Sequence, residues 1–334
     1  MLTKTKIIAF DYLRSFVILL VVIHHSVVAY TPFSEISPLI DKQQWAGFSF
    51  IVLFNDSFFM ALLFLVSGLF VWQSLTHKGI KTFLLSRLTR LGVPFLIITI
   101  IAYLFNINEI SGHLWFLWVL LEFNLFITLL YKFLPPLNQL LTKQNTIIKN
   151  PITFCLALII LSTLAYLPMA IPFGFQERIF FYLVYFIFGV WLGAQGIDNT
   201  IFKTSSKLAK YWWLYLALGI IIFFIRGFNG LLDNQQAIIS LLVYPISSAI
   251  IALGVSAVFI KFTKKSISII DNFSANAYGI YIIHYPFAIC LQFLLLNSNL
   301  HAIYKALIVL IGALLLSWRL SNILRRISIV RKII

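Results

Sequence analysis

Charged side chains are scarce in this sequence. They make up 10% of its 334 residues, whereas hydrophobic residues make up 61%. A soluble domain of this size needs a polar surface, and this chain has too few polar groups to cover one. Its apolar residues recur in long stretches, each near the length that a helix needs to cross a bilayer. We therefore predict an all-α fold, that of a polytopic integral membrane protein.

Cysteine is rare as well, and familiar catalytic signatures are absent. The two cysteines, Cys155 and Cys290, lie far apart inside apolar segments, which favours neither a disulfide framework nor a metal site. The sequence contains no Walker motif, HExxH, CxxC or G-x-S-x-G nucleophile elbow. It therefore carries no signature of nucleotide hydrolysis or of a thiol nucleophile, and we expect no metal ion.

Acidic residues are few: ten, against 25 lysines and arginines, for a formal net charge of +15. In a soluble protein this balance would suggest a nucleic-acid partner. Here the positive charges lie in short segments between apolar stretches, which is the pattern that orients membrane proteins. We expect contacts with membrane lipids and none with nucleic acid.

Ten spans are predicted, with uncertain ends. They lie at about residues 7–30, 53–75, 91–107, 114–134, 152–169, 179–195, 211–226, 237–260, 277–296 and 302–324. With a cytoplasmic N-terminus, most basic residues fall in inside segments, so both termini are expected in the cytoplasm. The first span lacks a following cleavage site and is expected to remain as a helix. We expect residues 1–334 to form a single membrane domain without a separate soluble domain.

The first span carries four groups that hydrocarbon penalises: Asp11, Arg14, His24 and His25. Arg14 and His25 differ by about 20° around a helix and by roughly 16 Å of rise, so they share one face. His24 points about 80° away from Arg14, and Asp11 can pair with Arg14 one turn later. Ionisable groups inside a membrane usually face a cavity or a partner. A structural Asp–Arg brace with a hydrogen-bonded histidine is the alternative.

Two further motifs suit either packing or ligand binding. Ser67 and Gly68 are small residues that allow another helix or a ligand to approach closely. Arg87 and Arg90, in the segment RLTR, are neighbours on one helix face. This arginine pair can orient the chain, bind lipid head groups, or hold a phosphorylated cofactor.

The fourth span begins GHLWFLWVLLEF and has polar side chains both at its outer end and in its interior. His113 lies at its outer end, and Trp115, Trp118 and Glu122 share one face. A tryptophan at this depth is often only an interfacial belt residue. A carboxylate a few turns into a span needs a partner or a proton.

The ninth span contains YGIYIIHYPF. Tyr278, Tyr281 and either His284 or Tyr285 share a face, and His284 lies about two turns into the membrane from the cytoplasmic side. A hydrogen bond between helices is the alternative explanation for this histidine.

Taken together, the segments DYLRSFVILLVVIHHS, FFMALLFLVSGLF, RLTRLGVPF, GHLWFLWVLLEF and SANAYGIYIIHYPF resemble, in order, those of the membrane acyltransferase-3 family. The resemblance implies transfer of an acyl group, acetyl or succinyl, from cytoplasmic acyl-CoA to a hydroxyl of a cell-surface or lipid-linked glycan. It implies acetyl-CoA or succinyl-CoA as the donor substrate, with no permanently bound cofactor. It also implies a multi-pass protein of the cell inner (plasma) membrane.

The resemblance carries over Arg14 and His25 as an essential pair, with His25 as a general base because an imidazole pKa lies near neutrality. Direct transfer is favoured, and a transient acyl-histidine stays open. The expected catalytic residues are His25, Arg14, Asp11 and Glu122. The expected acyl-CoA-binding residues are Arg14, Ser67, Gly68, Arg87, Arg90, Tyr281 and His284. The expected acceptor-binding residues are His24, His113 and Trp115.

Two other classes also place charged groups inside a membrane. A transporter or lipid flippase would show inverted repeats or broken helices in matched halves, and the sequence shows no clear repeat. A structural or sensory membrane protein would use the same groups to brace its helices. Acyl transfer by the purified protein separates the enzyme from both.

Overall fold

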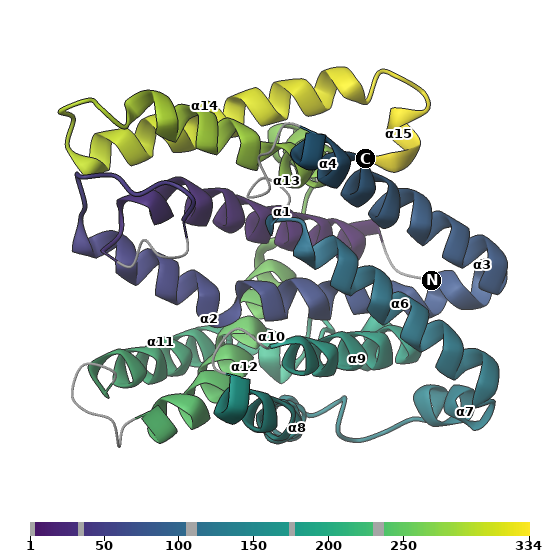
Figure 1. The fold of residues 1–334 in the computed structure, drawn as a ribbon. Helices are drawn as coiled ribbons and strands as arrows, with labels where there is room; N and C mark the ends of the chain where they lie inside the picture. The colour runs from purple at the N-terminus through teal and green to yellow at the C-terminus, as the bar shows by residue number, and fades with distance from the viewer. Residues whose placement is uncertain (1–3, 33–36, 105–111, 174–177, 230–236) are drawn as a thin grey trace. The chain divides into compact units, whose positions relative to one another are not determined.

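The computed structural model describes residues 4–32, 37–104, 112–173, 178–229 and 237–334. Throughout these residues the regular structure is helical, as the composition predicts (Figure 1). Among the described residues, eight helical stretches are long and apolar enough to cross a membrane. They are Ile8–Tyr30, Ala46–Gly68, Val71–Leu104, Trp115–Phe133, Pro151–Pro168, Leu241–Phe262, Ser268–Leu295 and Ala302–Leu324. Two shorter apolar helices, Ile179–Gln195 and Trp212–Ile225, accompany them, so the chain is a polytopic membrane protein.

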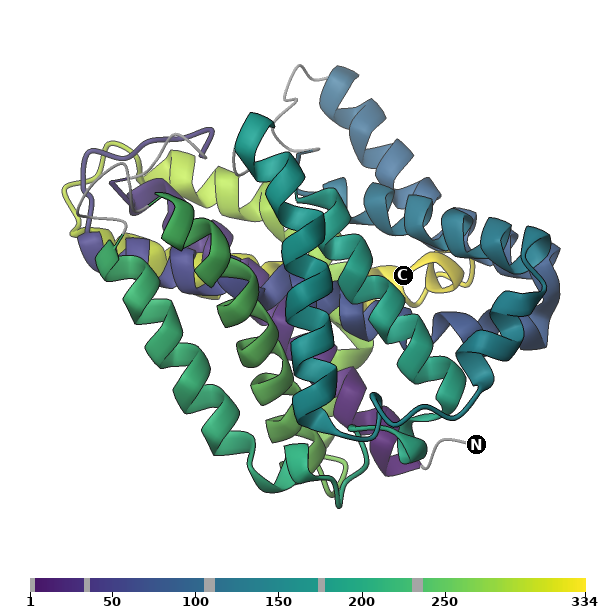
Figure 2. The same ribbon diagram turned by 90° about the horizontal axis from the view of Figure 1, so that it is seen from below.

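The chain divides by its internal contacts into two compact units. The first unit comprises Met1–Leu13, Ser57–Phe83 and Phe123–Ser266. Its helices include α7 (Pro136–Thr142), α8 (Pro151–Phe173), α9 (Ile179–Gln195), α10 (Lys207–Lys210), α11 (Trp212–Asn229) and α12 (Ala237–Phe262), with the short 3-10 turn η4 (Ile197–Asn199). Helix α11 lies along α12, and α8 contacts both α9 and α12. Figure 2 shows α11 and α12 side by side.

The second unit comprises Arg14–Asp56, Leu84–Glu122 and Ile267–Ile334. It contains the 3-10 turn η1 (Val28–Tyr30), the π-helix η3 (Leu88–Gly92), α4 (Val93–Leu104), α13 (Ser268–Leu295), α14 (Ala302–Leu324) and α15 (Val330–Ile333). A short loop joins α13 to α14, and the two pack as a hairpin (Figure 1). Buried alanines of this hairpin pack in one cluster with Val28 and Tyr30 of η1. Phe48 and Val52, near the start of the helix that begins at Ala46, belong to the same cluster.

Four helices contribute residues to both units. They are α1 (Lys4–Val27), α2 (Ala46–Gly68), α3 (Val71–Arg87) and α6 (Trp115–Phe133). The unit boundary falls after Leu13 in α1, so Asp11 belongs to the first unit, and Arg14, His24 and His25 belong to the second.

Several predicted span boundaries hold, and three are wrong. The expected ranges 179–195 and 302–324 coincide with α9 and α14. The expected span 53–75 instead begins at Ala46 and ends at Gly68. The expected span 277–296 instead begins at Ser268 and ends at Leu295. The expected span 91–107 is, as far as Leu104, part of a longer helical stretch, Val71–Leu104, which is broken by Gly79 at φ 74°. Residues 105–107 of that expected span lie outside the described residues. Hydropathy measures apolar content, so it detects neither a turn between two apolar segments nor a helix that continues through a polar one.

The turn at the end of α2 lies where two helices meet backbone to backbone. A Cβ atom added at Gly68 would lie 2.9 Å from the backbone nitrogen of Val190, and one added at Gly189 would lie 3.1 Å from the Cα of Gly68. No side chain fits between chains this close, so glycine is required on both sides. In the structure, Gly68 therefore serves the packing of α2 against α9.

Candidate active site

Three imidazoles from distant parts of the sequence meet in the second unit. The ring centroid of His25 lies 5.4 Å from that of His284 and 6.4 Å from that of His113. The rings of His113 and His284 are 5.5 Å apart. His25 comes from the last turn of α1, His113 from the residues just before α6, and His284 from the middle of α13. We call these three residues the imidazole cluster.

Two tyrosines of α13 complete this cluster. The ring of Tyr285 lies 4.7 Å from that of His25 and 4.8 Å from that of His113. The Tyr281 hydroxyl donates to the backbone carbonyl of His113 at 2.7 Å. Tyr281, His284 and Tyr285 occupy positions i, i+3 and i+4, which face the same way on a helix. That spacing explains why one short segment of α13 supplies three of the five rings.

A proline in α13 accounts for the orientation of His113. Pro286 has no N–H, so the carbonyl of Ile282, four residues earlier, loses its usual helical partner. The Nε2 atom of His113 lies 3.2 Å from that carbonyl oxygen. A carbonyl only accepts, so Nε2 is the protonated nitrogen of a neutral His113. The proline of the HYPF segment thus frees the carbonyl that holds His113, a residue from a distant part of the chain.

Helix α13 also anchors the end of α1 beside His25. Gln292 donates from Nε2 to the backbone carbonyl of His25 at 2.8 Å. Gln292 is buried, whereas the His25 side chain stays partly exposed. The backbone under His25 is therefore held by α13.

His24 has an electrostatic partner outside the imidazole cluster. Its ring lies 5.5 Å from that of His25, and it interacts electrostatically with Asp56 of α2. Asp56 was not among the expected site residues, although an acidic residue inside an apolar helix is itself a functional signal. Tyr285, considered only as an alternative to His284 on its helix face, and Gln292 were also missing from the expected site. All three are polar residues inside predicted spans.

A second group of side chains, which we call the arginine cluster, consists of Arg14, Arg87 and Arg90. Arg87 interacts electrostatically with both Arg90 and Arg14. Arg90 lies in η3, and its backbone carbonyl accepts a hydrogen bond from the Tyr278 hydroxyl. π-Helical turns are often found at functional sites. Like charges gathered in this way favour an anionic ligand, and guanidinium groups match phosphate in geometry.

Helix α1 connects the two clusters. Arg14 and His25 both lie within Lys4–Val27, an uninterrupted α-helix, and both side chains are partly exposed. Their separation on one face, roughly 16 Å along the axis, follows from helical geometry.

The remaining expected site residues lie on α1, α2, α6 and α13. Glu122 is exposed on α6, about two turns beyond Trp115, which is 37% exposed on the same helix face. Asp11, Ser67 and Gly68 belong to the first unit. Of the residues expected to bind acyl-CoA, His284 belongs to the imidazole cluster, and the ring of Tyr281 lies 6.1 Å from that of His113. Within the part of the chain that the structure describes, no three His, Cys, Asp or Glu side chains are placed to hold a metal ion.

Comparison with known proteins gives one result. A family model described as an acyltransferase domain matches residues 7–322, which include both clusters. Neither the comparison with curated proteins nor that with solved structures found a match.

Proposed function

We propose, from the premise that this chain belongs to the acyltransferase-3 family, that it moves a short acyl group from acyl-CoA to a glycan hydroxyl. Acyltransferase activity itself follows from the family. The proposed donor is acetyl-CoA or succinyl-CoA, and the proposed acceptor is a cell-surface or lipid-linked sugar. We further propose that residues 1–334 act as one catalytic domain in the plasma membrane.

The observation that carries this proposal is the placement of Arg14 and His25 on one helix. Arg14 belongs to the arginine cluster, and His25 belongs to the imidazole cluster. Acyl-CoA has the same two-ended form, because its phosphates lie at one end and its thioester at the end of a long thin arm. Phosphates held by Arg14, Arg87 and Arg90 would let that arm extend along α1 toward His25.

His25 is the proposed general base. Its imidazole takes the proton from the acceptor hydroxyl as the oxygen attacks the thioester carbon. The bond between that carbon and sulfur then breaks, and the imidazolium returns the proton to the sulfur of CoA. The half-buried position of His25 supports this role, because a base must be reached by both substrates. His24, His113 and Trp115 are the proposed contacts of the acceptor.

The proposal is tested with purified protein in nanodiscs. Release of the CoA thiol from acetyl-CoA and succinyl-CoA is followed with and without a lipid extract that contains the cell's glycans. The expected result is thiol release that depends on the extract, with acyl groups recovered as sugar esters by mass spectrometry. If neither donor reacts, or if acyl groups never reach a sugar, the proposed function is wrong.

A further inference from the structure

His284 is the most deeply buried member of the imidazole cluster. Its side chain is fully buried, and its Nδ1 atom lies 3.1 Å from the carbonyl oxygen of Ile280 and 2.8 Å from that of Tyr281. Both neighbours only accept hydrogen bonds, so Nδ1 must donate. A neutral imidazole with a proton on Nδ1 has an unprotonated Nε2. The backbone of α13 therefore fixes His284 with a lone pair on its outer nitrogen.

The lone pair of that outer nitrogen is unused. Nε2 of His284 is buried and has no hydrogen-bond partner among the residues that the structure describes. Burying an acceptor without a partner is costly. A residue that only braced α13 would need Nδ1 alone, and a smaller amide side chain would do the same. The second nitrogen therefore needs an explanation outside helix packing.

His25 is a suitable donor for this nitrogen. An N–H···N bond between two imidazoles, with about 3 Å between nitrogens, places the ring centroids roughly 5 Å apart. The observed separation of the His25 and His284 centroids is 5.4 Å. Hydrogen bonds of a catalytic site are often longer before substrate binds, so a small rotation of His25 closes the contact.

We propose that His284 is a positioning residue for His25. Its Nε2 accepts a hydrogen bond from one nitrogen of His25, which turns the other nitrogen of His25 toward the acceptor hydroxyl. This inference rests on the proposed function, in which His25 is the base. It adds that the base works as a histidine pair rather than alone.

The acyl transfer is balanced in protons, and the protonation state of His284 does not change during it. The acceptor O–H bond breaks and a new N–H bond forms on His25, while the oxygen bonds to the acyl carbon and the C–S bond breaks. The imidazolium of His25 then gives this proton to sulfur, and His284 only accepts a hydrogen bond throughout. A carboxylate has the corresponding position in the serine hydrolase triad. Within a membrane a neutral acceptor avoids the cost of burying a negative charge.

Two substitutions separate the two nitrogens of His284. In His284→Asn the side-chain amide lies near the place of Nδ1, so the backbone hydrogen bond is kept and the acceptor near His25 is lost. In His284→Gln the longer side chain puts an amide oxygen near the place of Nε2, so an acceptor is kept. His301→Asn is the matched control, because His301 is exposed at the N-terminal end of α14 and asparagine also caps helices.

The kcat and the KM for acyl-CoA are measured for each variant at equal amounts of folded protein. We expect His284→Asn to lower kcat by about 10²-fold, the lower limit for loss of a positioned base, with KM unchanged. His284→Gln should regain much of the lost kcat, and His301→Asn should match the wild type. If His284→Asn has the wild-type kcat, this inference is wrong and the proposed function is unaffected. An equal loss in the Asn and Gln variants also overturns it, because a brace would behave in that way.

A second measurement needs no variant to be active. In protein labelled with ¹⁵N-histidine, the signal of His284 is assigned by its loss in either variant. We expect its Nδ1 to be protonated and its Nε2 unprotonated at neutral pH, and a protonated Nε2 overturns the inference even where His284→Asn does not fold. A wild-type protein that transfers no acyl group refutes the proposed function and this inference together.

Discussion

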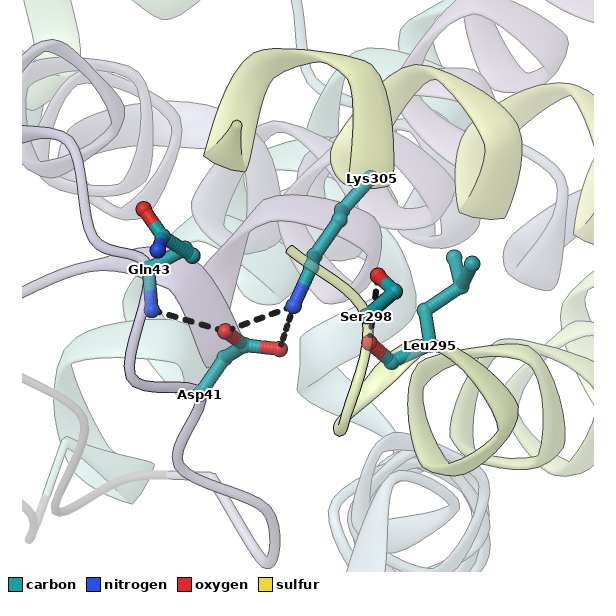
Figure 3. Close-up of polar contacts among 5 residues, drawn as sticks. All are labelled: Asp41, Gln43, Leu295, Ser298 and Lys305. Atoms are coloured by element: carbon teal, nitrogen blue, oxygen red, sulfur yellow. Dashed lines mark hydrogen bonds and ion pairs between the residues drawn. The ribbon is translucent and has the colours of Figure 1, made fainter. Parts of the chain in front are cut away.

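Lys305 and Asp41 form a buried, two-pronged ion pair in the second unit. The Nζ atom of Lys305 lies 2.9 Å and 2.8 Å from the two carboxylate oxygens of Asp41, and the two side chains are 0% and 2% exposed (Figure 3). The Asp41 carboxylate also accepts from the backbone N–H of Gln43 at 2.7 Å (Figure 3). The backbone N–H of Asp41 in turn donates to the carbonyl of Ala29 at 3.1 Å. The pair therefore ties α14 to the segment that follows η1, and the backbone N–H of Asp41 extends this tie to Ala29, four residues beyond His25.

We expect Asp41→Asn to destabilise the protein by about 3–5 kcal/mol, because it leaves a buried ammonium group without its charge partner. Thermal unfolding of the purified protein in detergent measures the effect. The double variant Asp41→Asn, Lys305→Met removes both charges and should recover part of the stability. If the single variant unfolds at the wild-type temperature, the pair contributes nothing to stability.

We expect His25→Ala to lower acyl transfer by about 10²–10⁴-fold, because it removes the proposed general base. His24→Ala should keep measurable activity, because helical geometry directs His24 about 80° away from Arg14 and His24 interacts electrostatically with Asp56. Both are assayed by thiol release at equal protein level. Wild-type turnover in His25→Ala, or inactivity of His24→Ala alone, would reverse the assignment.

The double variant Arg87→Gln, Arg90→Gln should weaken the binding of CoA, because it removes two charge-assisted contacts with phosphate. Each such contact is worth about 1.5–3 kcal/mol, so the dissociation constant should rise by at least about tenfold. Calorimetry with CoA and with pantetheine, which lacks the phosphates, measures this. Pantetheine affinity should not change, and Arg319→Gln, an exposed arginine of α14, is the control. If the variant and the wild type bind CoA equally well, Arg87 and Arg90 do not bind the phosphates, and their role is to orient the chain or to bind lipid.

Reporter fusions at Lys143 and Asn234 should read cytoplasmic and outside respectively. The distribution of lysine and arginine between successive loops is the reason, because basic loops are retained in the cytoplasm. Parallel fusions after Ile334 should read cytoplasmic. Reporters at Lys143 and Asn234 that read the same side would disprove the predicted orientation.

The sequence was sufficient for features that depend on a single helix. Apolar content alone indicates the membrane class, because too few polar groups remain to cover a soluble surface. The shared face of Arg14 and His25 follows from helical geometry once that span is continuous, and α1 is continuous over both residues. The positions of α9 and α14 were also predictable, since each is a single apolar segment with a clear end.

The sequence did not determine which of these groups meet. His113 and His284 lie far from His25 in the chain, and only the packing of α13 beside α1 and the start of α6 brings their rings together. The Asp41–Lys305 pair joins residues 264 positions apart for the same reason. The close approach of α9 to Gly68, the last residue of α2, likewise depends on the packing of two helices. Helix periodicity fixes the direction of a side chain relative to its own axis, whereas the identity of its neighbour is decided by the other helices that pack there.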